Sequence, residues 1–171
     1  SNGTATPYGT NNYNILQGTV TLGSSSIYTT VGDVTVASGA STTVTFGGNG
    51  NYTGNVTGAG NFTFNTTGAS GSYQGIMTMT GGTVNFTGTT SIAIGGPVTS
   101  VGLVNVTSNG AVILGSNITV TGAGNRLLVK AMGAISINSG ISLQTNNGDM
   151  VFWSNSTAGN SSNGILLATL N

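Results

Sequence analysis

The sequence of 171 residues contains no cysteine, no histidine and no glutamate. Those absences exclude the thiol nucleophile, the serine triad, the cysteine and histidine zinc cluster and the glutamate acid/base pair. The two carboxylates that remain, Asp33 and Asp149, lie about 20–25 Å apart along the axis of the coil that the repeats predict. A glycosidase needs its pair within about 5–10 Å, and one aspartate cannot cage calcium. We therefore expect a protein that is not an enzyme, with no catalytic, cofactor-binding or metal-binding residues.

Charge is almost missing as well, because the chain carries two basic and two acidic side chains and a formal net charge of +0 at pH 7. Such a surface has no excess of positive charge to attract nucleic acid or anionic lipid, so neither is an expected partner. No apolar run approaches the length that spans a bilayer, and membrane insertion is not expected. Hydrophobic residues still make up 37% of the chain at regular spacing, which favours a folded protein over a disordered one.

The sequence does contain an internal repeat, in which residues 110–132 can be laid over residues 133–155 without a gap. A repeat of this length, made of short alternating segments and glycine turns, is typical of a solenoid. The overlay aligns Val112 with Ile135, Leu114 with Ile137, Ile118 with Ile141, Val120 with Leu143, Leu127 with Met150 and Val129 with Phe152. The chain is therefore expected to form a coiled rod.

Each copy of the repeat carries three signals in which apolar residues flank a variable one, as in 112–114, 118–120 and 127–129. Each signal predicts a half-buried strand, and three strands per turn predict a triangular coil. Further signals lie upstream at 20–22, 34–36, 44–46, 62–64, 77–79, 84–86, 92–94 and 104–106. Glycine, asparagine, aspartate and serine cluster between the signals, where they favour turns.

One strand from each turn gives the period of the coil. The intervals in sequence number along the series Val20, Val44, Phe62, Val84, Val104, Leu127 and Met150 are 24, 18, 22, 20, 23 and 23. We predict an all-β fold, a right-handed parallel β-helix over residues 14–171 with about seven turns of 18–24 residues and three short strands per turn. Residues 1–13 are predicted to be an irregular segment that either caps its own rod or adds a strand to a neighbouring subunit.

The charged residues predict specific contacts, since residues 23 apart stack about 4.8 Å from each other on adjacent turns. Arg126 and Asp149 are 23 apart, and so are Lys130 and Trp153, the only tryptophan. We expect an exposed ion pair worth at most about 1 kcal/mol. We also expect a cation, or its alkyl stem, over an indole. Both pairs are interpreted as structural contacts that fix the register of neighbouring turns.

Ten N-x-Ser/Thr sequons are present, a number that the abundance of asparagine, serine and threonine largely explains. Asn85 and Asn105 fall outward on adjacent turns of one sheet, too close for two glycans, and are predicted to form an asparagine ladder. Asn155 and Asn160 lie in predicted loops and stay candidates for glycosylation.

Outward threonines suggest an alternative function. Thr21, Thr45 and Thr63 fall on one predicted face, and a flat threonine array can order water as ice-binding β-helices do. The positions that follow are Asn85, Asn105, Leu128 and Val151. The array is therefore interrupted, and outward threonine is common on solvated strands. Ice binding and carbohydrate binding are kept as alternatives to a structural function.

Two parts of the chain resemble bacterial repeats. Residues 133–155, GAISINSGISLQTNNGDMVFWSN, followed by 164–167, resemble the repeats of filamentous haemagglutinin. Residues 50–64, GNYTGNVTGAGNFTF, and 81–88, GGTVNFTG, are similar to the passenger-associated repeats of autotransporters. The resemblance implies a bacterial surface or secreted β-helix of the kind that forms adhesin shafts.

We therefore expect a structural rod of the cell surface or extracellular matrix. Two versions of this function are open. In one, the chain is a segment of an adhesin shaft, and its partner is the remainder of a larger adhesin. In the other, it is the subunit of a homopolymer whose copies stack end to end through their open strand edges. Surface glycans are a further expected partner.

Overall fold

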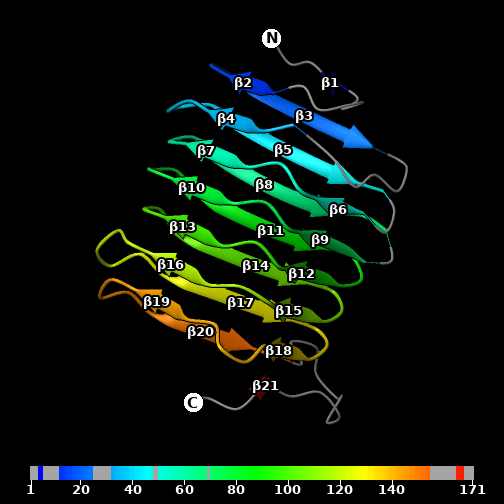
Figure 1. Cartoon of the computed structure of the whole chain (residues 1–171), viewed down its shortest axis with the longest axis vertical. Coiled ribbons are helices and arrows are strands. Elements are labelled where there is room, and N and C mark those ends of the chain that lie inside the picture. Colours follow the sequence, from blue (N-terminus) through cyan, green and yellow to red (C-terminus); the bar gives the residue numbers. More distant parts are fainter. Residues whose placement is uncertain are drawn as a thin grey trace.

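The computed structural model describes residues 4–5, 12–24, 32–47, 50–68, 70–154 and 165–167, and over these residues the chain is all β, without a helix. Its strands stack into three parallel sheets that run along the length of a β-solenoid (Figure 1). The predicted parallel β-helix with three strands per turn is confirmed, with about six turns. The eight-stranded sheet is called sheet A, the seven-stranded sheet is called sheet B and the six-stranded sheet is called sheet C.

Successive turns of the coil add their strands to the sheets in chain order. Sheet A holds β1 (Thr4–Ala5), β3 (Thr19–Ser24), β5 (Ser41–Phe46), β8 (Asn61–Thr66), β11 (Val84–Gly88), β14 (Val104–Ser108), β17 (Leu127–Ala131) and β20 (Met150–Trp153). Sheet B holds β2 (Tyr13–Ile15), β4 (Val34–Val36), β7 (Val56–Gly58), β10 (Met77–Met79), β13 (Val98–Ser100), β16 (Ile118–Val120) and β19 (Leu143–Thr145). Sheet C holds β6 (Asn51–Tyr52), β9 (Gly71–Tyr73), β12 (Ile92–Ile94), β15 (Val112–Leu114), β18 (Ile135–Ile137) and β21 (Ile165–Leu167).

The register between turns is confirmed over most of sheet A and corrected at its start. Four predicted pairings are present: Phe62 with Val84, Val84 with Val104, Val104 with Leu127 and Leu127 with Met150. Val20 pairs with Thr42 rather than Val44, and Thr42 pairs with Phe62. The first two intervals are therefore 22 and 20 instead of 24 and 18. Thr42 is buried at an inward position, so a search for apolar residues starts this strand two positions late.

The gapless overlay of the last two repeats is wrong in sheet B. Ile118 pairs with Leu143 rather than with Ile141, so the partner lies two positions further along the chain than the overlay places it. The corner between β18 and β19 has five residues, whereas the corresponding corner one turn earlier, between β15 and β16, has three. The corner between β19 and β20 has four residues, whereas that between β16 and β17 has six. These two changes cancel, so sheets A and C keep the 23-residue register. Gly140, with a φ of 75°, lies in the longer corner.

The core lies inside the coil, because the first and third residues of the three-residue strands point inward while the second points to solvent. Its composition changes along the rod. Five aromatic rings, those of Phe46, Tyr52, Phe64, Tyr73 and Phe86, contact one another with centroid distances of 5.5–6.3 Å. The fully buried hydrophobic residues of the following turns are aliphatic. Offset and edge-to-face ring contacts stabilise a fold by more than the burial of their area alone. The turns with aromatic residues therefore gain additional stability from contacts between neighbouring turns.

The first residues of the chain take part in the sheets where they are described. Thr4 and Ala5 pair with Thr21 and Leu22 of the same chain, and Tyr13 begins β2. The other residues of the predicted irregular segment 1–13, apart from Asn12, lie outside the described residues.

Candidate functional site

The outer faces of the three sheets hold the side chains that a partner could reach, since the interior of the coil is packed with apolar side chains. In a parallel solenoid, residues in register form columns along the rod, one residue per turn about 4.8 Å apart. Each column therefore presents a repeated chemical group. The columns of sheets A and B and the surface of sheet C are the candidate sites.

Sheet B carries an uninterrupted threonine column. Its members are the outward residues of five consecutive strands, in register with one another: Thr35, Thr57, Thr78, Thr99 and Thr119. The first four are exposed and the fifth is half-buried. The hydroxyl oxygens of Thr35 and Thr57 lie 3.3 Å apart, within hydrogen-bonding distance. The column forms a single row of hydroxyl and methyl groups along the rod.

A column of side-chain acceptors borders the threonines at the corner where the chain enters sheet B. The Asn12 Oδ1 accepts the Asp33 backbone N–H at 3.1 Å, and the Asp33 Oδ1 accepts that of Asn55 at 2.7 Å. The Asn55 Oδ1 accepts the N–H of Ile76 at 2.9 Å. The series is interrupted there, because isoleucine offers no acceptor and the next residue in the column, Pro97, has no N–H to donate. It resumes at Asn117, whose Oδ1 accepts the Ser142 N–H at 2.7 Å. Each side chain of the series therefore fastens its own turn to the next one.

The predicted asparagine ladder on sheet A is confirmed. The Asn105 Nδ2 donates to the Asn85 Oδ1 at 3.0 Å, and the Asn85 Nδ2 lies 3.5 Å from the Thr63 Oγ1. In this column Thr63 pairs with Thr43 and not with Thr45, because of the corrected register. These amide contacts join neighbouring turns and so serve the rod itself. The Asn105 Oδ1 is buried without a partner, because the next residue in the column is Leu128, which has no side-chain donor.

The outer face of sheet A carries charged and aromatic side chains at β17 and β20, where the preceding strands carry threonine and asparagine. Lys130 is in register with Trp153, and its Nζ lies 4.7 Å from the centroid of the indole ring. Arg126 and Asp149 precede strands that pair residue by residue, and the Leu127 N–H donates to the Asp149 carbonyl at 3.0 Å. Both of their side chains are exposed, and the described residues hold no ion pair between them. Two exposed charged side chains gain little from pairing, because water screens their attraction and the arginine loses conformational freedom.

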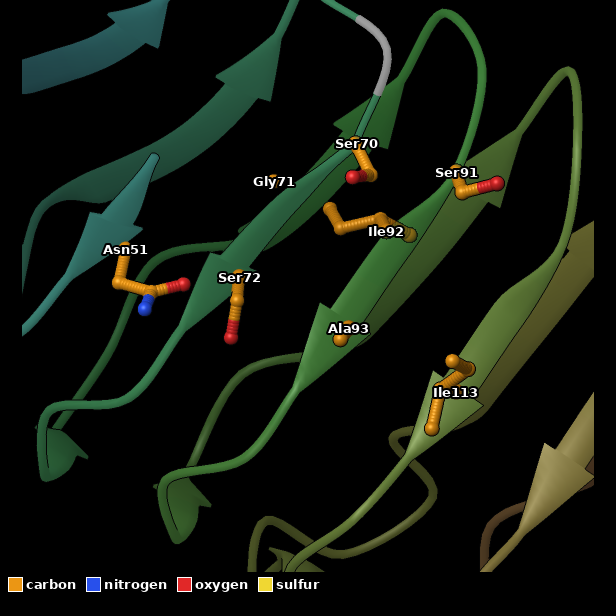
Figure 2. Close-up of a pocket in the computed structure, with 8 residues that line it drawn as sticks. All are labelled: Asn51, Ser70, Gly71, Ser72, Ser91, Ile92, Ala93 and Ile113. Carbon is orange, nitrogen blue, oxygen red and sulfur yellow. The ribbon is translucent and has the colours of Figure 1, made fainter. Parts of the chain in front are cut away.

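Sheet C bears a shallow hollow of about 230 Å³ on its outer face (Figure 2). The residues that line it come from β6, β9, β12 and β15 and the corners before them: Asn51, Ser70, Gly71, Ser72, Ser91, Ile92, Ala93 and Ile113. The lining is made of small side chains, with Ile113 41% exposed at one side. None of these residues is charged or aromatic, so the hollow offers neither an acid/base group nor a ring for stacking.

The titratable groups do not gather into a reactive cluster in the described part of the chain, where no three His, Cys, Asp or Glu residues lie together. Burial raises the pKa of the Tyr52 phenol, with the Asp33 charge adding to the effect. Burial likewise raises the pKa of Tyr73. Both phenols therefore stay protonated near neutral pH. That the protein is not an enzyme stays a prediction. The described residues contain no helix that is long and apolar enough to cross a membrane.

Two predicted site residues cannot be placed. The candidate glycosylation sites Asn155 and Asn160 lie outside the described residues. The threonine column of sheet B, in contrast, was not predicted. Its signal is present in the sequence, since a threonine is the middle residue of segments 34–36, 56–58, 77–79, 98–100 and 118–120. Following one strand per turn through sheet A misses this column, because it lies on another face of the coil.

No protein-family model matches the chain, and neither a curated protein nor a solved structure matches it. The parallel β-solenoid and the chemistry of its outer faces therefore carry the functional argument.

Proposed function

We propose that the chain is a structural, non-enzymatic rod of the cell surface or extracellular matrix, acting as part of an adhesin shaft or as the subunit of an extracellular filament. The continuity of the sheets carries this proposal. Every strand from β3 to β17 in sheet A has a paired neighbour on both sides, and so has every strand from β4 to β16 in sheet B. A coil without interruption transmits load along its axis through backbone hydrogen bonds.

The way in which the turns are joined also supports a rod that works outside the cell. Side-chain bonds between turns use amides and hydroxyls, as in Asn61, which donates to the Ser41 Oγ and accepts the Thr83 N–H. The described residues contain no ion pair that acidity or salt could weaken. The resemblance of residues 133–155 to filamentous haemagglutinin repeats points to the same class of protein.

Imaging and accessibility together test the proposal. Cells that express the native protein are labelled with an antibody and treated with an external protease, and the purified material is examined by negative-stain electron microscopy. We expect surface labelling and elongated particles. Long uniform filaments would assign the chain to a homopolymer, and stalks that belong to a larger protein would assign it to a shaft. Protein confined to the cytosol would contradict the proposal.

The threonine column favours ice binding as a second candidate. A row of hydroxyl and methyl groups whose first four members are exposed, repeating about every 4.8 Å, is close to a repeat of the water oxygens in ice. The residues directly after these strands are short as well: Ala37, Ala59, Thr80, Val101 and Thr121. On this side of the column the face therefore lacks long side chains that would hold an ice surface away from the threonines, whereas on its other side Ile76 is 56% exposed.

Ice-growth microscopy tests the second candidate. The wild-type chain is expected to shape ice crystals and to lower the freezing point below the melting point. Thr78→Tyr places a bulky ring in the middle of the column and should abolish both effects. Thr107→Tyr is the matched control, because Thr107 is an exposed outward residue of β14 on sheet A. Equal loss in the two variants, or no effect in the wild type, would rule out this function.

A further inference from the structure

Three of the four charged side chains and the only tryptophan lie together on two adjacent strands of sheet A or directly before them. The outward residues of β17 and the residue before it are Arg126, Leu128 and Lys130, and those of β20 are Asp149, Val151 and Trp153. We call these six residues the β17–β20 patch. They form two rows and three columns, about 13 Å along the strands and about 4.8 Å between the rows.

The chemistry of the patch differs from that of the same face upstream. In the preceding turns the two columns that reach Val151 and Trp153 consist of threonine and asparagine: Thr43, Thr63, Asn85, Asn105, Thr45, Asn65, Thr87 and Thr107. Several of these side chains bond to each other and so serve the rod. The patch instead exposes Trp153 to 53% and Val151 to 40%. A rod that needed only polar columns would not place its only tryptophan and three of its four charges here.

The indole of Trp153 is held by a neighbouring side chain and exposed, so a flat ligand can stack on it. Lys130 lies 4.7 Å from the ring centroid and limits the motion of the indole, which remains more than half exposed. At the opposite end of the patch, Arg126 and Asp149 form no ion pair with each other, so their polar groups are available to a ligand. The patch thus combines an aromatic platform, an aliphatic middle and a polar end.

The size of the patch argues for a small linear ligand rather than a protein. Two rows of three side chains cover an area on the order of 200 Å², whereas a stable protein interface needs about 800 Å² on each partner. A chain of two or three linked pyranose rings has about the required length, presents an apolar face to an indole and carries hydroxyls at its edges. Two cations against one anion give the patch a local positive charge in a protein of formal net charge +0.

We propose that the β17–β20 patch binds a short acidic oligosaccharide, with one sugar ring on Trp153 and a sugar carboxylate on Arg126. The guanidinium suits the carboxylate because it can donate two parallel hydrogen bonds. Asp149 accepts hydrogen bonds from sugar hydroxyls but also repels the carboxylate, so it weakens the affinity for an acidic ligand.

Binding of oligogalacturonides to the full chain, measured by isothermal titration calorimetry, tests this proposal. The fully methyl-esterified oligomer of the same length is the matched neutral probe. We expect the acidic oligomer to bind at least about tenfold more tightly than the ester. Trp153→Ala should weaken binding of the acidic oligomer by at least about tenfold, and Arg126→Gln should remove the preference for it over the ester. Asp149→Asn should strengthen binding by about twofold to fivefold.

The control variant is Gln144→Ala, which changes an exposed residue of sheet B and should leave the affinity unchanged. All four substitutions are at exposed positions, and circular dichroism checks that each variant is folded. Equal affinity for the acid and the ester would refute the acidic ligand. No binding to either, or binding that survives Trp153→Ala, would refute the site.

Discussion

At the scale of single residues, the two buried tyrosines show how differently one hydroxyl group can be accommodated in the same core. Both side chains are fully buried, and their rings stack with centroids 5.5 Å apart. The Tyr52 hydroxyl donates to the carbonyl of Gly32 at 3.3 Å. The Tyr73 hydroxyl is buried without a hydrogen-bond partner. A buried polar group without a partner destabilises the fold, whereas a satisfied one is neutral or stabilising.

Replacing each tyrosine by phenylalanine should therefore have opposite effects on stability. Tyr73→Phe removes an unpaired hydroxyl and should raise the free energy of unfolding by about 1 kcal/mol. Tyr52→Phe removes a hydrogen bond and should lower it by about 0.5–1 kcal/mol. Urea unfolding followed by circular dichroism measures both. A loss of stability in both variants would mean that the Tyr73 hydroxyl has a partner.

The same two residues predict how the fold responds to alkali. Burial raises the pKa of both phenols in the folded state, while in the unfolded chain they ionise near pH 10. The folded state therefore holds these protons more tightly. Stability is fully present below about pH 10 and falls at higher pH, by up to about 1.4 kcal/mol per pH unit for each tyrosine.

Urea midpoints measured on both sides of about pH 10, together with the ultraviolet absorbance of phenolate, test this dependence. The double variant Tyr52→Phe/Tyr73→Phe serves as the control and should lose stability less steeply. Ionisation of both phenols near pH 10 in the folded wild type would disprove the argument from burial.

At the scale of the element, the strands that were predicted from the sequence have two large inward residues, and several strands that were missed have a small one. Segments such as 77–79 and 112–114 show the apolar pattern and are strands. β9 and β13 were not predicted, because their inward positions include Gly71 and Ser100. At Gly71 a Cβ would lie 2.2 Å from the Cγ2 of Thr66, the last residue of β8, so this neighbour excludes the side chain that would have given the signal.

Of the candidate sites, one could likewise be predicted from the sequence and another could not. The Lys130–Trp153 contact depends only on a 23-residue spacing, which the repeat makes visible. The threonine column depends on aligning turns of different length, because its successive members are 22, 21, 21 and 20 apart in sequence number. Those lengths are set by the corners, and the corners have no periodic pattern from which they could be predicted.

The corners also predict which glycines the fold requires. Gly110 lies between β14 and β15, where a Cβ would be 1.5 Å from the Thr90 carbonyl oxygen on the adjacent turn. Gly110→Ala must push two turns apart and should lower the free energy of unfolding by about 3 kcal/mol. Gly124 is the control, since its φ is 73° but no atom lies within 4 Å of the added Cβ.

Gly124→Ala should lower the free energy of unfolding by only about 1 kcal/mol, the strain of a left-handed alanine. Thermal melts of the two variants give the comparison. Equal losses at both positions would show that close approach between turns is not what restricts Gly110.

At the scale of the whole molecule, the turns of the rod are joined by hydrogen bonds and apolar packing rather than by ion pairs. The described residues contain no ion pair, and Asp33, Arg126 and Asp149 are exposed. Sodium chloride between about 0.01 and 1 M should therefore change the free energy of unfolding by less than about 0.5 kcal/mol. Sodium sulfate is the positive control and should stabilise the fold, because it strengthens the burial of apolar surface. A marked loss of stability in sodium chloride would reveal an ionic contact that joins the turns.

The interrupted acceptor column of sheet B has a consequence for how this sequence can change over generations. Ile76 supplies no acceptor to the turn that follows it, and Pro97, in register one turn on, requires none. A replacement of Pro97 would create an N–H that lacks the partner its equivalents have at Asn55 and Ile76. An asparagine at position 76 would in turn have no donor to bind while Pro97 remains. The two positions are thus epistatic: each substitution becomes favourable only in the background of the other, and relatives of this chain should show them changing together.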